Sequence, residues 1–343
     1  MNTGRIKRTL ADLSSWAVNT YSSSARESMT RLDLSGEAYL SSVNPTNLYN
    51  SLSRCFALTD LSVVREFDTS QCTDISSCFY GDISLERLNL LKWDTSNITD
   101  MSGAFDTTAF SSLDLSTWDT SNVTKMRSMF GSGVIGTLDL SNFSSASLNT
   151  STASHLNGFY YIFDGNPKNY LILNSTTVKF VPTANSYLSG SCKILVPNSA
   201  LSAYKSNSFW STVSSRIEAI EDYTIWRNNG EVEVFPKTYN ASDIVVLNGT
   251  VAKPSTILAD TNTTISINYG NSSVTNVSMK GTLMCYTGDG GSSGSYNTSI
   301  GTITNGVLSF TRTYSSGSNV VVIYGTTYNN YKINKVAIQF NVA

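Results

Sequence analysis

Charge is what this sequence has least of. Asp, Glu, Lys and Arg make up only 14% of its 343 residues, and the formal net charge is -2. Soluble proteins average about 25% charged residues, so Ser, Thr, Asn and Gly must supply most of the polar surface here. The near-neutral balance excludes a surface that attracts nucleic acid or anionic membranes. We therefore expect neither among the partners.

The chain also lacks a long apolar run. No stretch approaches the roughly 18 apolar residues of a membrane span, which predicts no membrane insertion. Near the start, Asp12 and Ser14 interrupt what would otherwise resemble the apolar core of a secretion signal. Ile6 and Leu10 are instead spaced as on one face of a helix, so residues 1–28 are expected to form an N-terminal arm or helix. We expect synthesis in a cytoplasm, without export by the general secretion route.

Reactive groups are scarce as well. The five cysteines form no Cys-x-x-Cys pair, and their odd number suggests neither a zinc site nor a disulfide framework. His155 is the only histidine, so neither a catalytic triad nor a two-histidine metal site can be built within one chain. Phosphate-loop and Gly-x-Gly-x-x-Gly motifs are absent too. The sequence predicts a protein that is not an enzyme and holds no cofactor and no metal.

What the chain has instead is repetition. KWDTSNITDM runs from Lys92 to Met101, and TWDTSNVTKM runs from Thr117 to Met126, 25 positions later. Three markers keep this period, which indicates a repeated structural unit, because a catalytic site needs only one copy of each group. The markers are an aromatic residue (Phe67, Trp93, Trp118 and Phe143), a leucine pair (Leu88-x-Leu90, Leu113-x-Leu115 and Leu138-x-Leu140) and a phenylalanine (Phe79, Phe105 and Phe130).

Each unit has a physical interpretation. The Leu-x-Leu piece predicts a short strand with its leucines facing inward, and the aromatic marker fills the same core. Asp-Thr-Ser-Asn is typical of a turn, in which Asp68, Asp94 and Asp119 each bond their own backbone. The apolar spacing from Val123 to Met126 and onward predicts one face of a two-turn helix. One unit cannot bury these groups alone, so the pattern predicts a repeat solenoid with a short strand and a short helix in each coil.

The unit L-x-L-S-x-W-D-T-S-N-V-T-x-M-x-x-M-F resembles the 25-to-26-residue leucine-rich repeat of BspA-type surface proteins. That family includes mycoplasma surface lipoproteins and proteins encoded by bacteriophages and prophages. The resemblance is close over residues 60–143, and the segment 193–222, which begins KILVPNSALSAYK, resembles the C-terminal cap that closes such arrays. It implies a leucine-rich-repeat-like solenoid over residues 29–222 and a role in adhesion or surface display.

From residue 223 to residue 343 the pattern changes. About seven short, alternating, β-branched segments bounded by Gly, Asn or Ser predict an all-β, immunoglobulin-like sandwich. No Cys-Trp-Cys signature accompanies them, so the strand pattern alone carries this interpretation. GDGGSSGS at 288–295 is interpreted as a plain hairpin loop, since its single carboxylate, Asp289, is too little for a calcium site.

By analogy with the family we expect a non-enzymatic structural protein of a bacteriophage virion. It would be a head (capsid) or tail decoration, a tail fibre or another host-attachment component, and its location would be the virion. Its partners would be other virion structural proteins, further copies of itself in a homo-oligomer, and a glycan or protein of the host surface. Two alternatives stay open: a bacterial cell-surface adhesin, and a solenoid enzyme that degrades polysaccharides with clustered carboxylates.

Two surfaces are candidates for binding. Side chains beside and between the leucines should point outward from the sheet of a solenoid, where ligands commonly dock. That row is polar and weakly acidic and has no aromatic residue for sugar stacking, which favours a solvated face. Tyrosine-rich loops of the sandwich are the competing site, since such loops suit recognition. The candidate residues are Arg87, Asn89, Ser112, Asp114, Thr137 and Asp139 on the sheet, and Tyr324, Tyr328 and Tyr331 in the loops.

Overall fold

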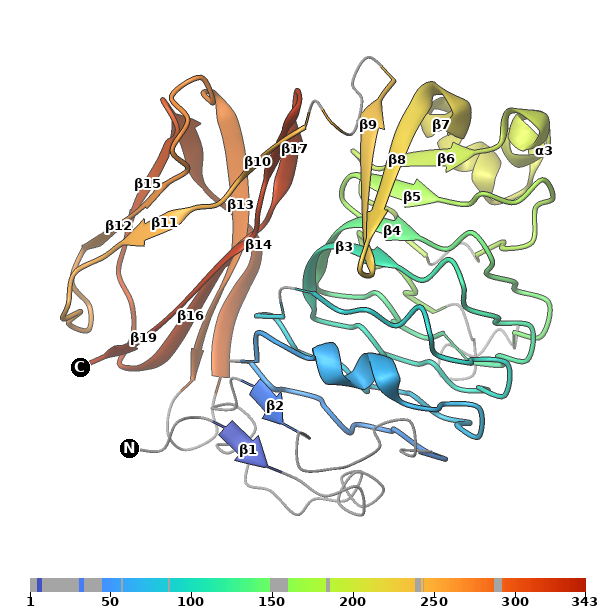
Figure 1. Ribbon diagram of the computed structural model, residues 1–343, viewed down its shortest axis with the longest axis horizontal. Helices are drawn as coiled ribbons and strands as arrows, with labels where there is room; N and C mark the ends of the chain where they lie inside the picture. The colour runs from blue at the N-terminus through green and yellow to red at the C-terminus, as the bar shows by residue number, and fades with distance from the viewer. Residues whose placement is uncertain are drawn as a thin grey trace. The chain divides into compact units, whose positions relative to one another are not determined.

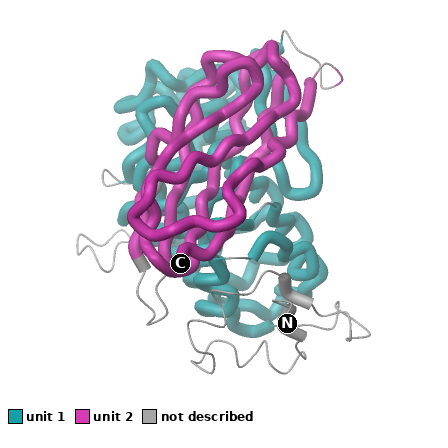
Figure 2. The backbone as a smooth tube through the Cα atoms, turned by 90° about the vertical axis from the view of Figure 1, so that its left-hand side faces the viewer, with its two compact units in different colours: residues 1–237 teal, residues 238–343 magenta. Residues whose placement is uncertain are grey.

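The chain divides into two compact units, residues 1–237 and residues 238–343 (Figures 1 and 2). The computed structural model describes residues 5–7, 31–33, 45–56, 58–85, 87–148, 160–182, 186–237, 242, 244–286 and 292–343. The sequence placed a boundary at residue 223, whereas the structure keeps the following two strands with the first unit. Most of the predicted arm at 1–28, together with His155 and Asp289, lies outside the described residues. In the described part, no helix has the length and apolar character to cross a membrane.

The predicted fold class, a solenoid of strand-plus-helix coils followed by an immunoglobulin-like sandwich, is wrong. Strands hold 36% of the residues and helices only 9%, and the structure includes antiparallel sheets, one of them nearly closed like a barrel. In the first unit the segment expected to be helical, residues 123–130, consists of turns. In the second unit most strands join one large sheet instead of two facing ones.

Hydrogen bonding explains the missing helix. A helix bonds each N–H to the carbonyl four residues earlier. Here the N–H of Phe130 donates to the carbonyl of Ile162 in the neighbouring repeat at 2.8 Å, while the N–H of Met129 closes a local turn on Met126 at 2.6 Å. Ser128 also has a φ of 51°, in the left-handed region that a right-handed helix excludes. The segment is therefore a stack of turns whose bonds alternate between its own repeat and the next.

One face of the first unit is a five-stranded parallel sheet. Its strands follow one another in chain order: β3 (Ala109–Asp114), β4 (Val134–Asp139), β5 (Tyr170–Ile172), β6 (Lys193–Val196) and β7 (Ile217–Ala219). The register places Leu113 beside Leu138 and Leu138 beside Leu171. Earlier repeats contribute isolated parallel bridges, such as that between Asp60 and Arg87. The leucines that the repeat period aligns are thus stacked directly on one another.

Two columns of aromatic rings run through the core of this unit, and neighbouring rings within each column are stacked 5.5 to 6.5 Å apart. The first column is Phe79, Phe105, Phe130 and Phe163, and the second is Trp93, Trp118 and Phe143. All seven side chains are buried. The first column continues to Phe163 although 33 residues, not 25 or 26, separate it from Phe130. The core pattern therefore persists through a longer, irregular repeat.

The aspartates of the Asp-Thr-Ser phrase cap their own turns, and this prediction is confirmed. Oδ1 of Asp68, Asp94 and Asp119 accepts the N–H of the serine two residues later, at 3.0, 3.0 and 2.9 Å. The threonine that follows links repeats, since Oγ1 of Thr95 donates to the carbonyl of Asp119 at 2.9 Å. The repeated phrase is a structural device in each copy.

A hairpin and short helices complete the first unit. Residues 193–222 form the strand, helix, buried tryptophan (Trp210) and final strand that the sequence indicates. The hairpin of β8 (Tyr223–Asn228) and β9 (Glu231–Pro236) follows. The remaining elements are β1 (Arg5–Lys7), β2 (Arg31–Asp33), α3 (Leu201–Ser206) and the 3-10 helices η2 (Ser62–Glu66), η3 (Asn198–Ala200), η4 (Trp210–Arg216) and η5 (Ile220–Asp222).

The second unit is built on a seven-stranded antiparallel sheet in the order β11-β12-β15-β14-β13-β16-β19, and β10-β18-β17 form a smaller sheet. Register shifts interrupt β13 between Met279 and Lys280 and between Gly281 and Leu283, and such bulges bend a sheet. This curvature wraps the large sheet around the core, to which the smaller sheet adds Leu247 and Ile333. The strands are β10 (Val245–Leu247), β11 (Thr250–Ala252), β12 (Thr263–Asn268), β13 (Val277–Tyr286), β14 (Ser292–Thr304), β15 (Val307–Arg312), β16 (Gly317–Ile323), β17 (Thr326–Tyr328), β18 (Tyr331–Ile333) and β19 (Val336–Val342).

Candidate functional site

The six sheet residues predicted as a binding face, which we call the sheet row, lie beneath the β8–β9 hairpin (Figure 1). The N–H of Val232 on β9 donates to Oγ of Ser112 at 2.9 Å. Arg87 is exposed, and its Nε lies 3.5 Å from a carboxylate oxygen of Glu231. The other five side chains are buried: Asn89, Ser112, Asp114, Thr137 and Asp139. The structure brings the residues of the sheet row together, but the hairpin packs over them, so they do not form a face open to solvent.

The tip of the hairpin is fitted closely to the sheet. Gly230 has a φ of 85°, and a Cβ there would lie 2.5 Å from the carbonyl oxygen of Leu88. Its own carbonyl accepts the N–H of Asp114 at 2.9 Å. The amide of Asn89 donates to Oδ1 of Asn229 at 2.8 Å. Only glycine combines this conformation with so close an approach, so the tip is specified by one residue.

One arginine of the hairpin serves two buried carboxylates. Arg227 lies 2.5 Å from Asp139 through Nη2 and 3.5 Å from Asp114 through Nε. Burial raises the pKa of Asp139, although the hydroxyl of Ser141 and the guanidinium oppose the shift. A charge that is buried without a partner is strongly unfavourable. By pairing with Asp114 and Asp139, Arg227 offsets the cost of burying these two carboxylates under the hairpin.

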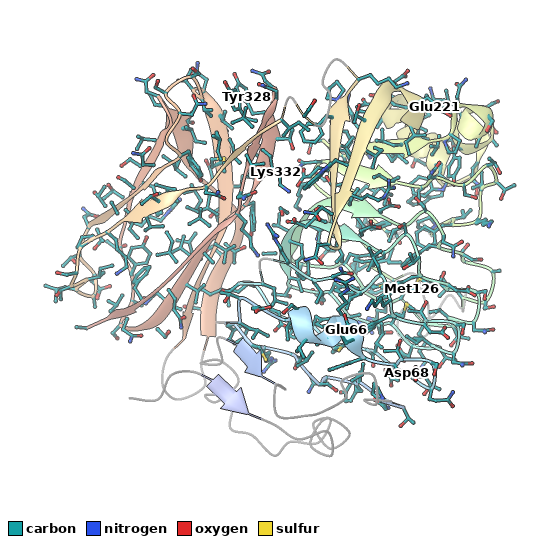
Figure 3. The ribbon with its side chains drawn as sticks, viewed as in Figure 1. Glu66, Asp68, Met126, Glu221, Tyr328 and Lys332 are labelled. Atoms are coloured by element: carbon teal, nitrogen blue, oxygen red, sulfur yellow. The ribbon has the colours of Figure 1, made fainter. Side chains whose placement is uncertain are left out.

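The three tyrosines predicted for the second unit do not form a projecting cluster. Tyr324 is buried, and its hydroxyl shares a hydrogen bond with that of Thr282. Tyr328 and Tyr331 pair with each other across β17 and β18 and pack, half-buried, against the core of the unit; Figure 3 labels Tyr328. These side chains contribute mainly to packing.

Exposed tyrosines gather elsewhere, in the first unit. The rings of Tyr160 and Tyr161 lie 4.2 Å apart, and those of Tyr161 and Tyr187 lie 6.3 Å apart, measured between centroids. Tyr161 is 37% exposed and Tyr187 57%. The guanidinium of Arg127 lies over the ring of Tyr160 at 5.4 Å. We call Tyr160, Tyr161 and Tyr187 the tyrosine cluster. Contiguous exposed apolar area of this kind marks binding surfaces more often than isolated residues do.

Local sequence explains why these rings face outward. In YYIFDG the next two residues, Ile162 and Phe163, are fully buried, and Phe163 ends the first aromatic column. The two tyrosines before them therefore remain on the surface of the turn. Tyr161 has a φ of 54°, a backbone conformation that is rare for a bulky residue. Ser77 and Ser128 occupy the same position in earlier repeats and also have positive φ, so the repeat itself sets this backbone conformation.

Carboxylates border the cluster. Asp164 is exposed, and Oγ of Ser132 donates to it at 3.4 Å. Burial raises the pKa of Asp106, and the nearby charge of Asp164 raises it further. A hydrogen bond with the hydroxyl of Tyr160 raises the pKa of Tyr161, and the charge of Asp164 raises it further. The hydroxyl of Tyr161 therefore stays protonated and can donate a hydrogen bond. The turn offers ring faces, hydroxyl donors and carboxylate acceptors within a few residues.

Sequence reasoning missed this cluster, although a signal existed. Relative to the phenylalanine marker, Tyr160 and Tyr161 occupy the positions of Arg127 and Ser128 in the previous repeat. The irregular interval hides that alignment until Phe163 is recognised as the next marker. Among the described residues, no three or more His, Cys, Asp or Glu side chains are grouped so that they could hold a metal ion.

Residues 46–162, about a third of the chain, match the model of a family described as "Mycoplasma protein of unknown function, DUF285". This is a mycoplasma-type repeat family associated with BspA-like surface proteins. The resemblance to mycoplasma-type repeats is therefore confirmed over that range, while an origin in a bacteriophage or prophage stays a prediction. The comparison with curated proteins finds no match, and neither does the comparison with solved structures.

Proposed function

We propose that this protein is a non-catalytic binding protein, displayed at a surface, that attaches to carbohydrate through the tyrosine cluster. The observation that carries the proposal is the cluster itself. Two rings that are 37% and 57% exposed lie 6.3 Å apart, in a unit whose other aromatic columns are buried. Exposed rings contribute nothing to the core, and they present flat apolar faces with a polar tip. Such faces suit the C–H faces of sugar rings.

The polar rim narrows the ligand to a neutral saccharide. Asp164 can accept hydrogen bonds from sugar hydroxyls, and the phenol hydroxyls can donate or accept. Two cations offset the two carboxylates of this region in number, because Arg127 lies over the ring of Tyr160 and Lys168 donates to the carbonyl of Gly165, the residue after Asp164. With such a balance, neither an anionic nor a cationic glycan gains binding affinity from electrostatic attraction. The affinity of a neutral polyhydroxylated glycan does not depend on that attraction.

The setting we propose is the bacteriophage virion, where the protein would be a head or tail decoration, a fibre or a host-attachment component beside other virion proteins. The match of residues 46–162 to a family associated with surface proteins supports display. The resemblance to repeats encoded by phages favours the particle over its alternative, a bacterial surface. A mass-spectrometric inventory of purified particles tests the setting. Detection at a fixed copy number per particle supports it, and detection on host envelopes alone overturns it.

The binding proposal is tested with the full chain on an array of neutral glycans. We expect binding that Tyr161→Ala combined with Tyr187→Ala weakens by at least about tenfold, the effect of losing an interface's central aromatic residues. Tyr49→Ala is the matched control, because Tyr49 is a 47% exposed tyrosine of the same unit outside the cluster. Absence of glycan binding, or equal binding by the double variant, would contradict the proposal.

The same experiment separates binding from cleavage. Two carboxylates beside a sugar site are what a glycoside hydrolase uses, and the pKa of Asp106 is raised as that of a general acid would be. Bound glycans are therefore assayed for new reducing ends. Release of reducing ends that Asp164→Asn and Asp106→Asn abolish would replace the proposal with a polysaccharide-degrading activity.

A further inference from the structure

The second unit contains a cavity that the proposed function does not use. Its volume is about 570 Å³, within the range of small-molecule sites. β14 and β15 pair only beside their connecting turn, through Ile303 with Leu308 and Thr304 with Val307. Beyond that turn the two strands diverge, and the cavity lies among the far parts of β13, β14, β15 and β16. Its opening is thus a consequence of the strand pairing.

Two residues of the lining have polar atoms in need of a partner. Within the described part of the chain, Nε of Arg312 and the hydroxyl of Tyr314 are buried without a hydrogen bond. Tyr314 is 5% exposed, and its ring packs edge-on against Phe340 with centroids 5.0 Å apart. Nη2 of Arg312 donates to the carbonyl of Ser299 at 2.6 Å, which holds the guanidinium in place. Buried polar atoms are almost always satisfied, so a ligand that brings an acceptor into the cavity would satisfy this pair.

The charge of the cavity indicates what kind of acceptor. Arg312 is the only charged side chain among the described residues of the lining. The lining also includes the hydroxyl-bearing residues Ser293, Ser295, Thr313 and Ser315, and Met284 and Val320 supply an apolar wall. Burial raises the pKa of Tyr314, so its hydroxyl stays protonated and can donate. A carboxylate matches the guanidinium in charge and geometry, and a polyhydroxylated body matches the hydroxyl groups.

We propose that this cavity binds a small acidic sugar, a uronic acid in chemical class, with its carboxylate on Nε of Arg312 and the hydroxyl of Tyr314. This site is independent of the tyrosine cluster, which takes a neutral saccharide. The protein then has two recognition sites of different charge, one in each unit.

The test is calorimetric titration of the full-length protein with glucuronate. Glucose is the neutral control with a related ring, and inorganic phosphate is the simple-anion control. We expect glucuronate to bind at least about tenfold more tightly than glucose or phosphate. Absence of glucuronate binding would overturn the proposal. Equal binding of phosphate would overturn its saccharide part and leave a general anion site.

Two variants assign the binding to the cavity. Arg312→Gln should weaken glucuronate binding at least about tenfold, and Tyr314→Phe at least about threefold, since the second keeps its ring against Phe340. Lys253→Gln removes a cation of the same unit outside the lining and should leave binding unchanged. Binding that survives both cavity variants would overturn the assignment.

A stability measurement tests the premise that the hydroxyl of Tyr314 has no hydrogen-bond partner within the protein. If the hydroxyl of Tyr314 has no internal partner, Tyr314→Phe should leave the melting temperature unchanged or raise it. A lowered melting temperature would show that the hydroxyl is already satisfied within the fold. Variants of the tyrosine cluster should not alter glucuronate binding, so failure at one site is distinguishable from failure at the other.

Discussion

Two pairs of aspartates in the repeats of the first unit have opposite environments. Asp114 and Asp139 lie on the sheet, are fully buried, and share Arg227 of the hairpin. Asp106 and Asp164 lie on the turns on the far side of the repeat, and Asp164 remains exposed beside the tyrosine cluster. We call them the sheet pair and the turn pair.

A row of repeated side chains acquires its role from what covers it. Every repeat position generates a row of similar side chains, whatever that row is for. A segment that comes later in the sequence decides whether such a row is covered or stays exposed. The hairpin covers the sheet pair and supplies a counter-charge, which makes that row part of the structure. In the turn pair, Asp164 keeps its access to solvent, so its row remains available for a ligand.

The substitution with the largest expected effect on the sheet pair is Arg227→Ala. The substitution leaves two buried carboxylates without their cation, which costs about 3–5 kcal/mol for a fully buried pair. Because the side chain of Arg227 is itself 38% exposed, we expect about 2–3 kcal/mol from urea unfolding. Lys92→Ala, which breaks the exposed pair with Glu66, is the control and should show no measurable loss. Equal effects of the two variants would mean that the hairpin does not seal a buried pair.

The same variant has a predictable pH dependence. Burial raises the pKa of Asp139 in the folded state. As the pH rises, the folded protein therefore keeps this proton after the unfolded chain has released it. Removing Arg227 removes an influence that lowers this pKa, so it rises further. Stability from such a proton is present at low pH and is lost as the pH rises through the folded pKa. The deficit of Arg227→Ala should therefore shrink as the pH falls from neutral, and a constant deficit would contradict this origin.

Gly230→Ala should have the next largest effect. A Cβ would force a left-handed alanine to within 2.5 Å of the Leu88 carbonyl, so we expect a loss of at least about 2 kcal/mol. Gly165→Ala is the matched control in the same unit, since Gly165 has a φ of 83° but no atom closer than 3.6 Å. It should lose only about 1 kcal/mol. Hydrogen exchange should show faster exchange in β8 and β9 for the first variant alone.

A smaller effect, with the opposite sign, is expected from Tyr161→Gly. Glycine adopts the φ of 54° without strain, so the melting temperature should stay constant or rise by about 1–3 °C. Glycan binding should nevertheless be lost. Tyr160→Gly is the control, because that position has no left-handed backbone to relieve and should lose stability. A clear drop in the melting temperature of Tyr161→Gly would mean that the exposed ring is there for packing.

The smallest effect concerns the turn pair. Asp164→Asn removes a like charge near Asp106, so the pKa of Asp106 should fall while burial keeps it above its ordinary value. Stability that depends on the proton of Asp106 falls as the pH rises through its folded pKa, and the variant should shift this loss to lower pH. Carboxyl NMR titration measures the change directly. An unchanged titration of Asp106 would show that the two carboxylates do not interact.

The sequence predicts contacts that recur at a fixed interval and fails where a contact depends on a distant segment. The period of 25 residues anticipates the stacking of Trp93 on Trp118 and the register of Leu113 with Leu138. The apolar spacing around Met126 fits a helical face and a stack of turns equally well. The left-handed position in this segment is occupied by Ser128 and not by a glycine, which would have marked it. The pattern alone therefore could not distinguish a helix from a stack of turns.

The site shows the same limit. EVEVFP is recognisable as a strand, but nothing local says that it folds back over Ser112, which lies 120 positions before Val232 in the chain. The sheet row therefore looks open in the sequence and is closed in the structure. In the second unit, individual strands are recognisable, whereas their pairing into one curved sheet depends on the lengths and bulges of β13 and β14.

The turns of the first unit share a left-handed backbone at one position of each repeat. The row that ends in Tyr161 contains Asn50, Ser77, Gly103 and Ser128, all with positive φ. The fold demands a left-handed backbone there, which favours glycine and asparagine, yet Ser77, Ser128 and Tyr161 show that other side chains are accommodated. Substitutions along this row therefore change backbone strain and the surface of the turns. A lineage could change its ligand by altering these residues one at a time, without rebuilding the protein that carries them.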